Sequence, residues 1–184
     1  MSGTRFTTTD LLDAHEAGVE SGTVQVLQPG LLALGRLKAF SGMVVTLKLF
    51  EDNSLLADLV KGPGEGRVAV VDAGGSLRCA VLGGNLAAAA ARNGWAGLVI
   101  YGCARDADEI DSCEIGVRAL ALHPRRSIKR GEGQRDIAVT FMGATIRPGQ
   151  WIYADRDGVI VSQQPLCVDP ARRARCRREP QVPC

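Results

Sequence analysis

The chain has 184 residues, of which 46% are hydrophobic, 23% are charged and 4% are aromatic, and it contains 22 glycines. This composition is that of an ordinary globular protein, and the length fits a single domain whose core can fold without disulfides or metals. No apolar run approaches the roughly 18–20 residues that a membrane-spanning helix needs, so we expect no membrane segment.

The charge is unevenly distributed along the chain. The formal net charge is +2, and residues 167–184 carry five arginines against Asp169 and Glu179, which gives +3 there and −1 for the other 166 residues. We predict one domain over residues 1–164 and a basic, disordered tail over residues 165–184. A body without excess positive charge argues against a specific nucleic-acid binder, and RNA attraction by Arg172–Arg178 would be salt-sensitive and non-specific.

The N-terminus and the cysteines indicate the cellular compartment. Residues 1–13 lack the charged-then-apolar pattern of an export signal. The six cysteines form no CxxC pair, so the spacing of a zinc site is absent. We expect reduced thiols and a cytoplasmic location.

The first third of the chain predicts short elements and one clear strand. Thr7 to Asp10 offers N-cap residues for a short first helix, and residues 24–26 and 31–37 indicate short extended segments. Residues 43–50 alternate as a strand does, with Met43, Val45, Leu47 and Leu49 on one face. A helix through residues 55–60 is expected after Asp52-Asn53, and Gly62-Pro63-Gly64 ends it.

The middle third predicts parallel pairing. Val68–Val71 is a continuous apolar run, typical of a strand buried on both faces, and residues 79–82 indicate another short strand. After Gly83-Gly84-Asn85, an alanine-rich helix from Leu86 is expected to end at Asn93-Gly94. Residues 95–101 then predict a buried strand that Gly102 ends. This succession is typical of an α/β fold.

The last third predicts an antiparallel region. We expect a turn of helix over residues 107–112, an apolar strand over 117–122 and a basic loop over 125–131. Short strands are expected over residues 137–141, 151–154 and 159–161, because turn signals separate them.

Two segments combine residue types that bind anions and metals. Gly83, Gly84, Asn85 and Leu86 lie at the start of the alanine-rich helix, where backbone N–H groups and the positive helix end attract an anion. Arg105 and Asp106 follow a buried strand, at the end where open α/β sheets bind ligands. Arg105 is suited to a carboxylate, and Asp106 to one coordination position of Mg²⁺ or Mn²⁺.

Other interpretations remain open on the residues alone. An Arg-Asp pair at a strand end also occurs as a surface turn or local ion pair, and a Gly-Gly turn also serves only to start a helix. Cys103 is a conceivable nucleophile, although no histidine neighbours it in sequence. Two histidines leave little for a triad or a multi-histidine metal site, and no GxGxxG or Walker A pattern occurs.

A set of motifs in order along the chain resembles the RraA-like family, which includes the regulator of ribonuclease E activity A and the class II 4-hydroxy-4-methyl-2-oxoglutarate aldolases. The resemblance extends over about residues 6–162. It is carried by Phe50-Glu51-Asp52-Asn53, Val71-Asp72-Ala73-Gly74-Gly75-Ser76, Gly83-Gly84-Asn85-Leu86-Ala87, Asn93-Gly94-Trp95-Ala96-Gly97, Tyr101-Gly102, Arg105-Asp106, Pro148-Gly149, Tyr153-Ala154-Asp155 and Asp157-Gly158-Val159.

The resemblance implies a swivelling β/β/α domain with mixed parallel and antiparallel strands, assembled as a ring-shaped homotrimer with sites at subunit boundaries. It implies that Gly83 to Leu86 and Arg105 bind the carboxylate of a small 2-keto acid such as pyruvate or oxaloacetate. It also implies that Asp106 binds a divalent metal cation, Mg²⁺ or Mn²⁺, and that Arg105 and Asp106 are catalytic.

The sequence departs from the aldolase pattern at one position. That pattern has an aspartate 21 positions before the arginine, where it helps to hold a metal-bound water, and this chain has Gly84 there. In the aldolases an acidic residue near the C-terminus of a neighbouring subunit also supports that water, and the arginine-rich tail offers no clear counterpart.

The resemblance therefore predicts a metal-dependent lyase that releases pyruvate from 4-hydroxy-4-methyl-2-oxoglutarate and decarboxylates oxaloacetate. Decarboxylation is expected to survive the departure at Gly84 better, because it needs no removal of a hydroxyl proton. The alternative is a non-catalytic trimeric regulator that binds and inhibits ribonuclease E. Retention of Asp106 favours the enzyme, whereas the missing aspartate favours the regulator.

Overall fold

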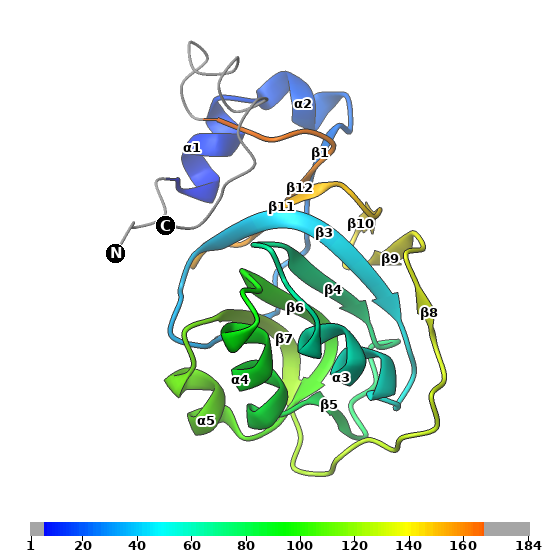
Figure 1. Ribbon diagram of the computed structural model, residues 1–184. Coiled ribbons are helices and arrows are strands. Elements are labelled where there is room, and N and C mark those ends of the chain that lie inside the picture. The colour runs from blue at the N-terminus through cyan, green and yellow to red at the C-terminus, as the bar shows by residue number, and fades with distance from the viewer. Residues whose placement is uncertain (1–5, 168–184) are drawn as a thin grey trace.

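The computed structural model describes residues 6–167, which form five helices and twelve strands (Figure 1). The helices are α1 (Thr8–Asp13), α2 (Glu16–Glu20), α3 (Ser54–Lys61), α4 (Gly84–Arg92) and α5 (Ala107–Ser112). The strands are β1 (Val24–Val26), β2 (Leu32–Leu34), β3 (Phe40–Lys48), β4 (Val68–Asp72), β5 (Ala80–Leu82), β6 (Gly97–Ala104), β7 (Gly116–Leu122), β8 (Gln134–Arg135), β9 (Val139–Phe141), β10 (Ala144–Ile146), β11 (Trp151–Ala154) and β12 (Val159–Ser162).

The main sheet combines parallel and antiparallel pairings, as the sequence predicts. Among the described residues its order is β1-β12-β11-β3-β4-β6-β7-β2, with β5 beside β6 and β8 beside β3. β3, β4, β6 and β7 are parallel neighbours, and β5 is parallel to β6. Parallel neighbours need a crossover connection, and α3, α4 and α5 provide it within the βαβ successions of the chain. The other pairs of this sheet are antiparallel.

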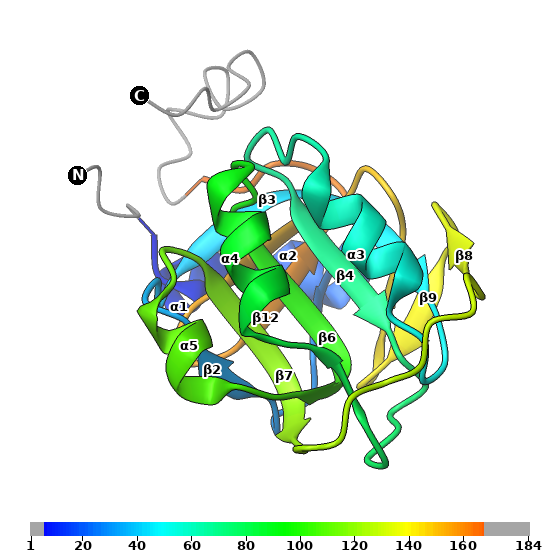
Figure 2. The same cartoon turned by 60° about the horizontal axis from the view of Figure 1, so that its bottom comes forward.

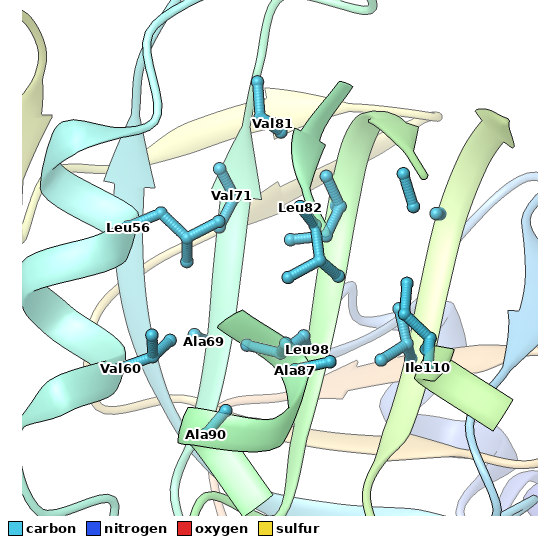
Figure 3. Close-up of a cluster of buried hydrophobic side chains, with 14 of the residues drawn as sticks. Leu56, Val60, Ala69, Val71, Val81, Leu82, Ala87, Ala90, Leu98 and Ile110 are labelled. Carbon is cyan, nitrogen blue, oxygen red and sulfur yellow. The ribbon is translucent and has the colours of Figure 1, made fainter. Parts of the chain in front are cut away.

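The molecule has three layers. The parallel strands lie in the middle and are buried on both faces by the other two. α3, α4 and α5 cover one face (Figure 2). There Leu56 and Val60 of α3, Ala87 and Ala90 of α4, and Ile110 of α5 pack against Val71 and Leu98 of the sheet (Figure 3). On the other face Val70 and Val99 pack against residues of β9–β12. The β/β/α arrangement predicted from the resemblance is therefore confirmed.

The helix and strand predictions are largely confirmed. α1 begins as expected, since the Thr7 side chain accepts a hydrogen bond from Asp10 N–H. β4 is buried at every position, and β11 has the expected bounds. Several bounds differ from the predicted ones. β2 is shorter than residues 31–37, β3 extends from Phe40 to Lys48, α4 begins at Gly84, β6 begins at Gly97 and β9 begins at Val139. α2, β8 and β10 have no counterpart among the predictions.

The prediction that Gly102 ends a strand is wrong. β6 extends through Gly102 to Ala104, and its pairing with β7 shifts register between Ile100 and Cys103. A Cβ atom on Gly102 would lie 2.7 Å from the Cβ of Ala73, which is too close for two side chains. This glycine therefore permits close packing within the sheet rather than ending the strand.

A buried polar contact joins α1 to the sheet. The Asp155 carboxylate accepts hydrogen bonds from the Thr8 backbone N–H at 2.6 Å and from the Thr8 hydroxyl at 2.7 Å. The buried Arg118 guanidinium of β7 donates to the Lys38 and Asp155 carbonyls at 2.7 and 2.6 Å. Burial lowers the pKa of Arg118, and the nearby Asp155 charge acts in the opposite direction. These groups fix the β11–β12 turn and α1 to the central sheet.

Three of the cysteines within the described residues are free thiols. These are Cys79, Cys103 and Cys113, as predicted, but Cys167 is disulfide-bonded, so the prediction of reduced thiols is wrong there. The tail predicted over residues 165–184 lies mostly outside the described residues. Within residues 6–167 no helix has the length and apolar character to cross a membrane.

Asp52 anchors the loop that leads from β7 to β8. Its side chain is fully buried and accepts hydrogen bonds from the backbone N–H groups of Ser54 at 2.7 Å, Arg130 at 2.5 Å and Glu132 at 3.3 Å. Burial by itself would raise the pKa of Asp52, but these hydrogen bonds and one from the Ser54 hydroxyl lower it to about 2. The basic loop after β7 is thus held against the start of α3.

We expect Asp52→Asn to destabilise the protein at pH 7 by about 2 kcal/mol, since a pKa held below its ordinary value of 3.8 stabilises the folded state when ionised. The native pKa is lowered, so this stabilisation is complete above pH 4 and is lost as the pH falls towards 2. Urea unfolding of both proteins at several pH values measures it. A difference that does not shrink below pH 4 would contradict the assignment.

Candidate active site

The pairing of β5 with β6 brings the two predicted segments together. The strands run parallel with Leu82 opposite Ala104, so Gly83 and Arg105, the next residues of each chain segment, leave the same edge of the sheet. The Arg105 backbone N–H donates to the Leu82 carbonyl at 2.9 Å and fixes the exit of both strands. The carboxyl ends of parallel strands are where such folds bind ligands.

Asp106 is held in an unusual backbone conformation. Its φ and ψ angles of 59° and 50° lie in the left-handed region, which non-glycine residues adopt infrequently. One carboxylate oxygen, Oδ2, accepts hydrogen bonds from the Gly84 backbone N–H at 3.3 Å and from Arg105 Nε at 3.2 Å. About a third of each side chain of the Arg105–Asp106 pair stays accessible. The conformation presents the carboxylate to the start of α4, where the positive end of the helix favours it.

A pocket of about 380 Å³ opens beside this pair. Its lining consists of Arg105, Asp106, Ala107, Leu122, His123 and Pro124. A second pocket is lined by the end of α4 and by Cys113 and Glu114, which precede β7, so it lies away from the carboxyl edge of the parallel strands. The pocket beside Arg105 and Asp106 is therefore the candidate active site.

The glycine-rich segment has more than one role. Gly83 is half-buried and Gly84 is buried, whereas Asn85 is exposed and Leu86 packs partly against the hydrophobic core. The Gly83 carbonyl accepts hydrogen bonds from Leu86 and Ala87 and so begins the helix. Because Asp106 accepts the Gly84 N–H, one donor expected to face a substrate anion is already bound to the protein's own carboxylate.

His123 belongs to the site, although sequence reasoning gave it no role. It follows β7 directly, and its backbone N–H donates to the Ala104 carbonyl at 2.9 Å. Its Nδ1 accepts a hydrogen bond from the Arg125 N–H at 3.1 Å, which orients the ring. The sequence could have indicated His123, because it is a polar residue directly after a predicted strand, at the end where parallel sheets bind ligands.

Glu109 of α5 was also not predicted. An added Cβ on Gly84 would collide with Oε2 of Glu109 and would lie 2.6 Å from its Cβ, while one on Gly83 would lie 2.9 Å from Oδ2 of Asp106. Neither glycine has a positive φ, so side-chain space is the reason for both. Nothing in the local sequence pattern revealed this contact between helices.

Cys103 does not have the environment of a nucleophile. Its side chain is buried and its Sγ donates to the Ser76 carbonyl at 3.5 Å. Burial raises the pKa of its thiol, and the neighbouring Cys79 raises it further. A thiol that stays protonated is inert.

The family of this chain follows from its similarity to known proteins. The RraA-like family, described as Aldolase/RraA, matches residues 8–161. The chain belongs to the RraA-like family. A Burkholderia multivorans protein named "Putative 4-hydroxy-4-methyl-2-oxoglutarate aldolase" is 56% identical over 161 residues, which are 88% of this chain and 98% of that protein.

Two solved structures support the same assignment. The RNA-processing inhibitor RraA from Thermus thermophilis is 39% identical, with a TM-score of 0.82 over 88% of this chain and 95% of that one. A Geobacillus kaustophilus structure titled as an S-adenosylmethionine: 2-dimethylmenaquinone methyltransferase is also 39% identical, with a TM-score of 0.80 over 87% and 96%. Proteins with the RraA-like fold therefore have several functional names, so the fold alone does not identify the function and the residues of the site are the basis for proposing one.

We expect Gly84→Ala to lower the free energy of unfolding by about 1–3 kcal/mol, the usual cost of overpacking, because Glu109 occupies the space of the new methyl group. Asn85→Ala, on the exposed side of the same helix turn, is the matched control and should change stability by less than about 0.5 kcal/mol. Urea unfolding measures both. Equal stability of the two variants would show that the α4–α5 contact is looser than described.

Proposed function

We propose that this protein is a carbon–carbon lyase for small 2-keto acids, which uses Mg²⁺ or Mn²⁺ and works as a homotrimer. Its reactions would be release of pyruvate from 4-hydroxy-4-methyl-2-oxoglutarate and decarboxylation of oxaloacetate. The observation that carries the proposal is the accessible Arg105–Asp106 pair beside the N-terminus of α4, at the carboxyl edge of a parallel sheet. The name of the 56% identical Burkholderia protein supports the same chemistry.

The donor set suits one class of cation. Within residues 6–167 no three His, Cys, Asp or Glu side chains gather into a metal-holding group, which argues against a closed zinc-type centre there. Asp106 offers one partly exposed carboxylate. Mg²⁺ and Mn²⁺ accept such a site, because they bind one or two carboxylates and complete their octahedra with water and substrate oxygens. Asp106 would therefore hold the cation.

The chain's own residues provide recognition and charge. The Arg105 guanidinium can donate two parallel hydrogen bonds to the carboxylate of a 2-keto acid, and its charge stabilises negative charge that develops on the adjacent keto oxygen. The Gly84 N–H and Arg105 fix the Asp106 carboxylate before substrate arrives. A bound cation would supply Lewis-acid stabilisation of the negative charge that develops on the keto oxygen.

The two reactions differ in one requirement. Both form the enolate of pyruvate, but aldol cleavage also needs a base for the proton of the C4 hydroxyl. Gly84 supplies no side chain for this task. Oxaloacetate decarboxylation therefore needs fewer groups than aldol cleavage does.

Both lyase reactions should require the metal and Asp106. We expect pyruvate release from both substrates with Mg²⁺ or Mn²⁺, none above blank with EDTA, and loss to the blank rate in Asp106→Ala. Asp108→Ala removes a neighbouring exposed charge of α5 and is the control that should stay active. Pyruvate is measured by a coupled assay, with metal-only blanks because oxaloacetate decarboxylates unaided. Efficient aldol cleavage without any decarboxylation would contradict the shared enolate.

Arg105 should determine how tightly the substrate carboxylate is held. We expect Arg105→Lys to raise KM for oxaloacetate about tenfold, since lysine keeps the charge but loses the second of two parallel hydrogen bonds, worth roughly 1.4 kcal/mol. Steady-state kinetics of the two proteins give the values. An unchanged KM would remove Arg105 from substrate binding.

A regulatory role is the second candidate. The likeness to the RNA-processing inhibitor RraA favours it, and ribonuclease E would be the partner. Such a protein would bind by surface contact and would not depend on Asp106. Rates no better than blank for both substrates, with binding to ribonuclease E that survives Asp106→Ala, would replace the lyase by this function.

A further inference from the structure

The absence of a side chain at Gly84 leaves room for the side chain of Glu109. The backbone φ of Gly84 is not positive, so a side chain would cost nothing in backbone strain. The space that a side chain would need is taken by Glu109, whose Oε2 occupies it and whose Cβ would lie 2.6 Å from the new Cβ. A flexible carboxylate end can rotate away, but a Cβ cannot. A side chain at position 84 and the present position of Glu109 therefore exclude each other.

Glu109 thereby places a second carboxylate at the start of α4. Asp106 touches Gly84 through its N–H, and Glu109 touches the same residue from α5. α4 has nine residues, and its N-terminus favours negative charge. Glu109 remains exposed to solvent, so water and solutes reach its carboxylate. Two acidic groups from the first turn of α5 and its cap thus approach one glycine.

We propose that Glu109 is the acidic positioning residue of this site and supplies from α5 the carboxylate that residue 84 lacks. The inference depends on the proposed lyase function. Glu109 accepts a hydrogen bond from the water that removes the C4 hydroxyl proton, and it adds negative charge beside the cation that Asp106 holds. It acts on the substrate through that water.

Aldol cleavage moves one proton and one electron pair, and each has a defined destination. The C4 hydroxyl of 4-hydroxy-4-methyl-2-oxoglutarate gives its proton to the water beside Glu109, and its oxygen becomes the carbonyl oxygen of one pyruvate. The C3–C4 bond breaks, and its electron pair forms the enolate of the second pyruvate. That enolate takes the same proton back from the water at C3 and leaves as pyruvate, so no oxidant or further reactant is needed.

The test compares Glu109→Gln with Asp108→Asn, which removes one charge from the adjacent exposed position of α5. Mn²⁺ binding to the full chain, measured by electron paramagnetic resonance without substrate, should weaken about tenfold in Glu109→Gln, as loss of a group that supports a metal ligand does. Asp108→Asn should bind as the parent does. Glu109→Gln should also lose aldol cleavage more than oxaloacetate decarboxylation, because only cleavage needs the base.

A second test moves the carboxylate from position 109 to position 84 and asks whether metal binding and activity return. Gly84→Asp combined with Glu109→Gly removes the colliding side chain and restores one carboxylate at the same place. Compared with Glu109→Gly alone, this double variant should regain Mn²⁺ affinity and aldol cleavage. Circular dichroism and urea unfolding establish that both variants are folded at the assay temperature.

The outcomes separate the two proposals. A parent protein that binds Mn²⁺ and releases pyruvate, with Glu109→Gln indistinguishable from Asp108→Asn, would overturn the role of Glu109 and leave the lyase function standing. Folded variants in which the added Gly84→Asp substitution restores nothing would also overturn it. A parent that neither binds Mn²⁺ nor releases pyruvate would overturn the lyase function and this inference with it.

Discussion

The candidate site depends on the hydrogen bond between the Gly84 N–H and the Asp106 carboxylate. This bond joins the start of α4 to the turn between β6 and α5, where Asp106 has a left-handed backbone conformation. It requires that residues 83 and 84 have no side chains, because Asp106 and Glu109 occupy the space above them. Under the proposed function, this carboxylate is the one that would hold the cation, and its two hydrogen bonds orient it in advance.

The sheet supplies the frame for this contact. β5 and β6 end side by side because they are parallel and bonded from Leu82 to Arg105. β7 ends at the same edge and places His123 beside them. The antiparallel layer contributes no residue to the pocket lining, and it buries the opposite face of the parallel strands. The candidate pocket is therefore lined by residues at the ends of the parallel strands and the start of α5, and the antiparallel layer contributes to the core instead.

The sequence patterns that predicted elements correctly were local ones. The Thr7 cap of α1, the apolar run of β4 and the alternation within β3 each depend on neighbours in the chain. Gly102 was misinterpreted, because a glycine that ends a strand and one that admits Ala73 have the same sequence signal. α2 lacks both a side-chain cap and buried residues, which left its sequence without a helical pattern to detect.

The sequence by itself determined most of the helices and strands, and it showed that Arg105 and Asp106 follow a buried strand and that a glycine pair precedes a helix. It also carried the motifs of the RraA-like family. Only the tertiary structure decided which groups meet at the site. The contact of Glu109 with Gly84 and the position of His123 depend on how helices and strands pack, and no local periodicity encodes those distances. The sequence showed that position 84 has a glycine where the aldolase pattern has an aspartate. Only the fold showed that Glu109 occupies the space that a side chain there would need.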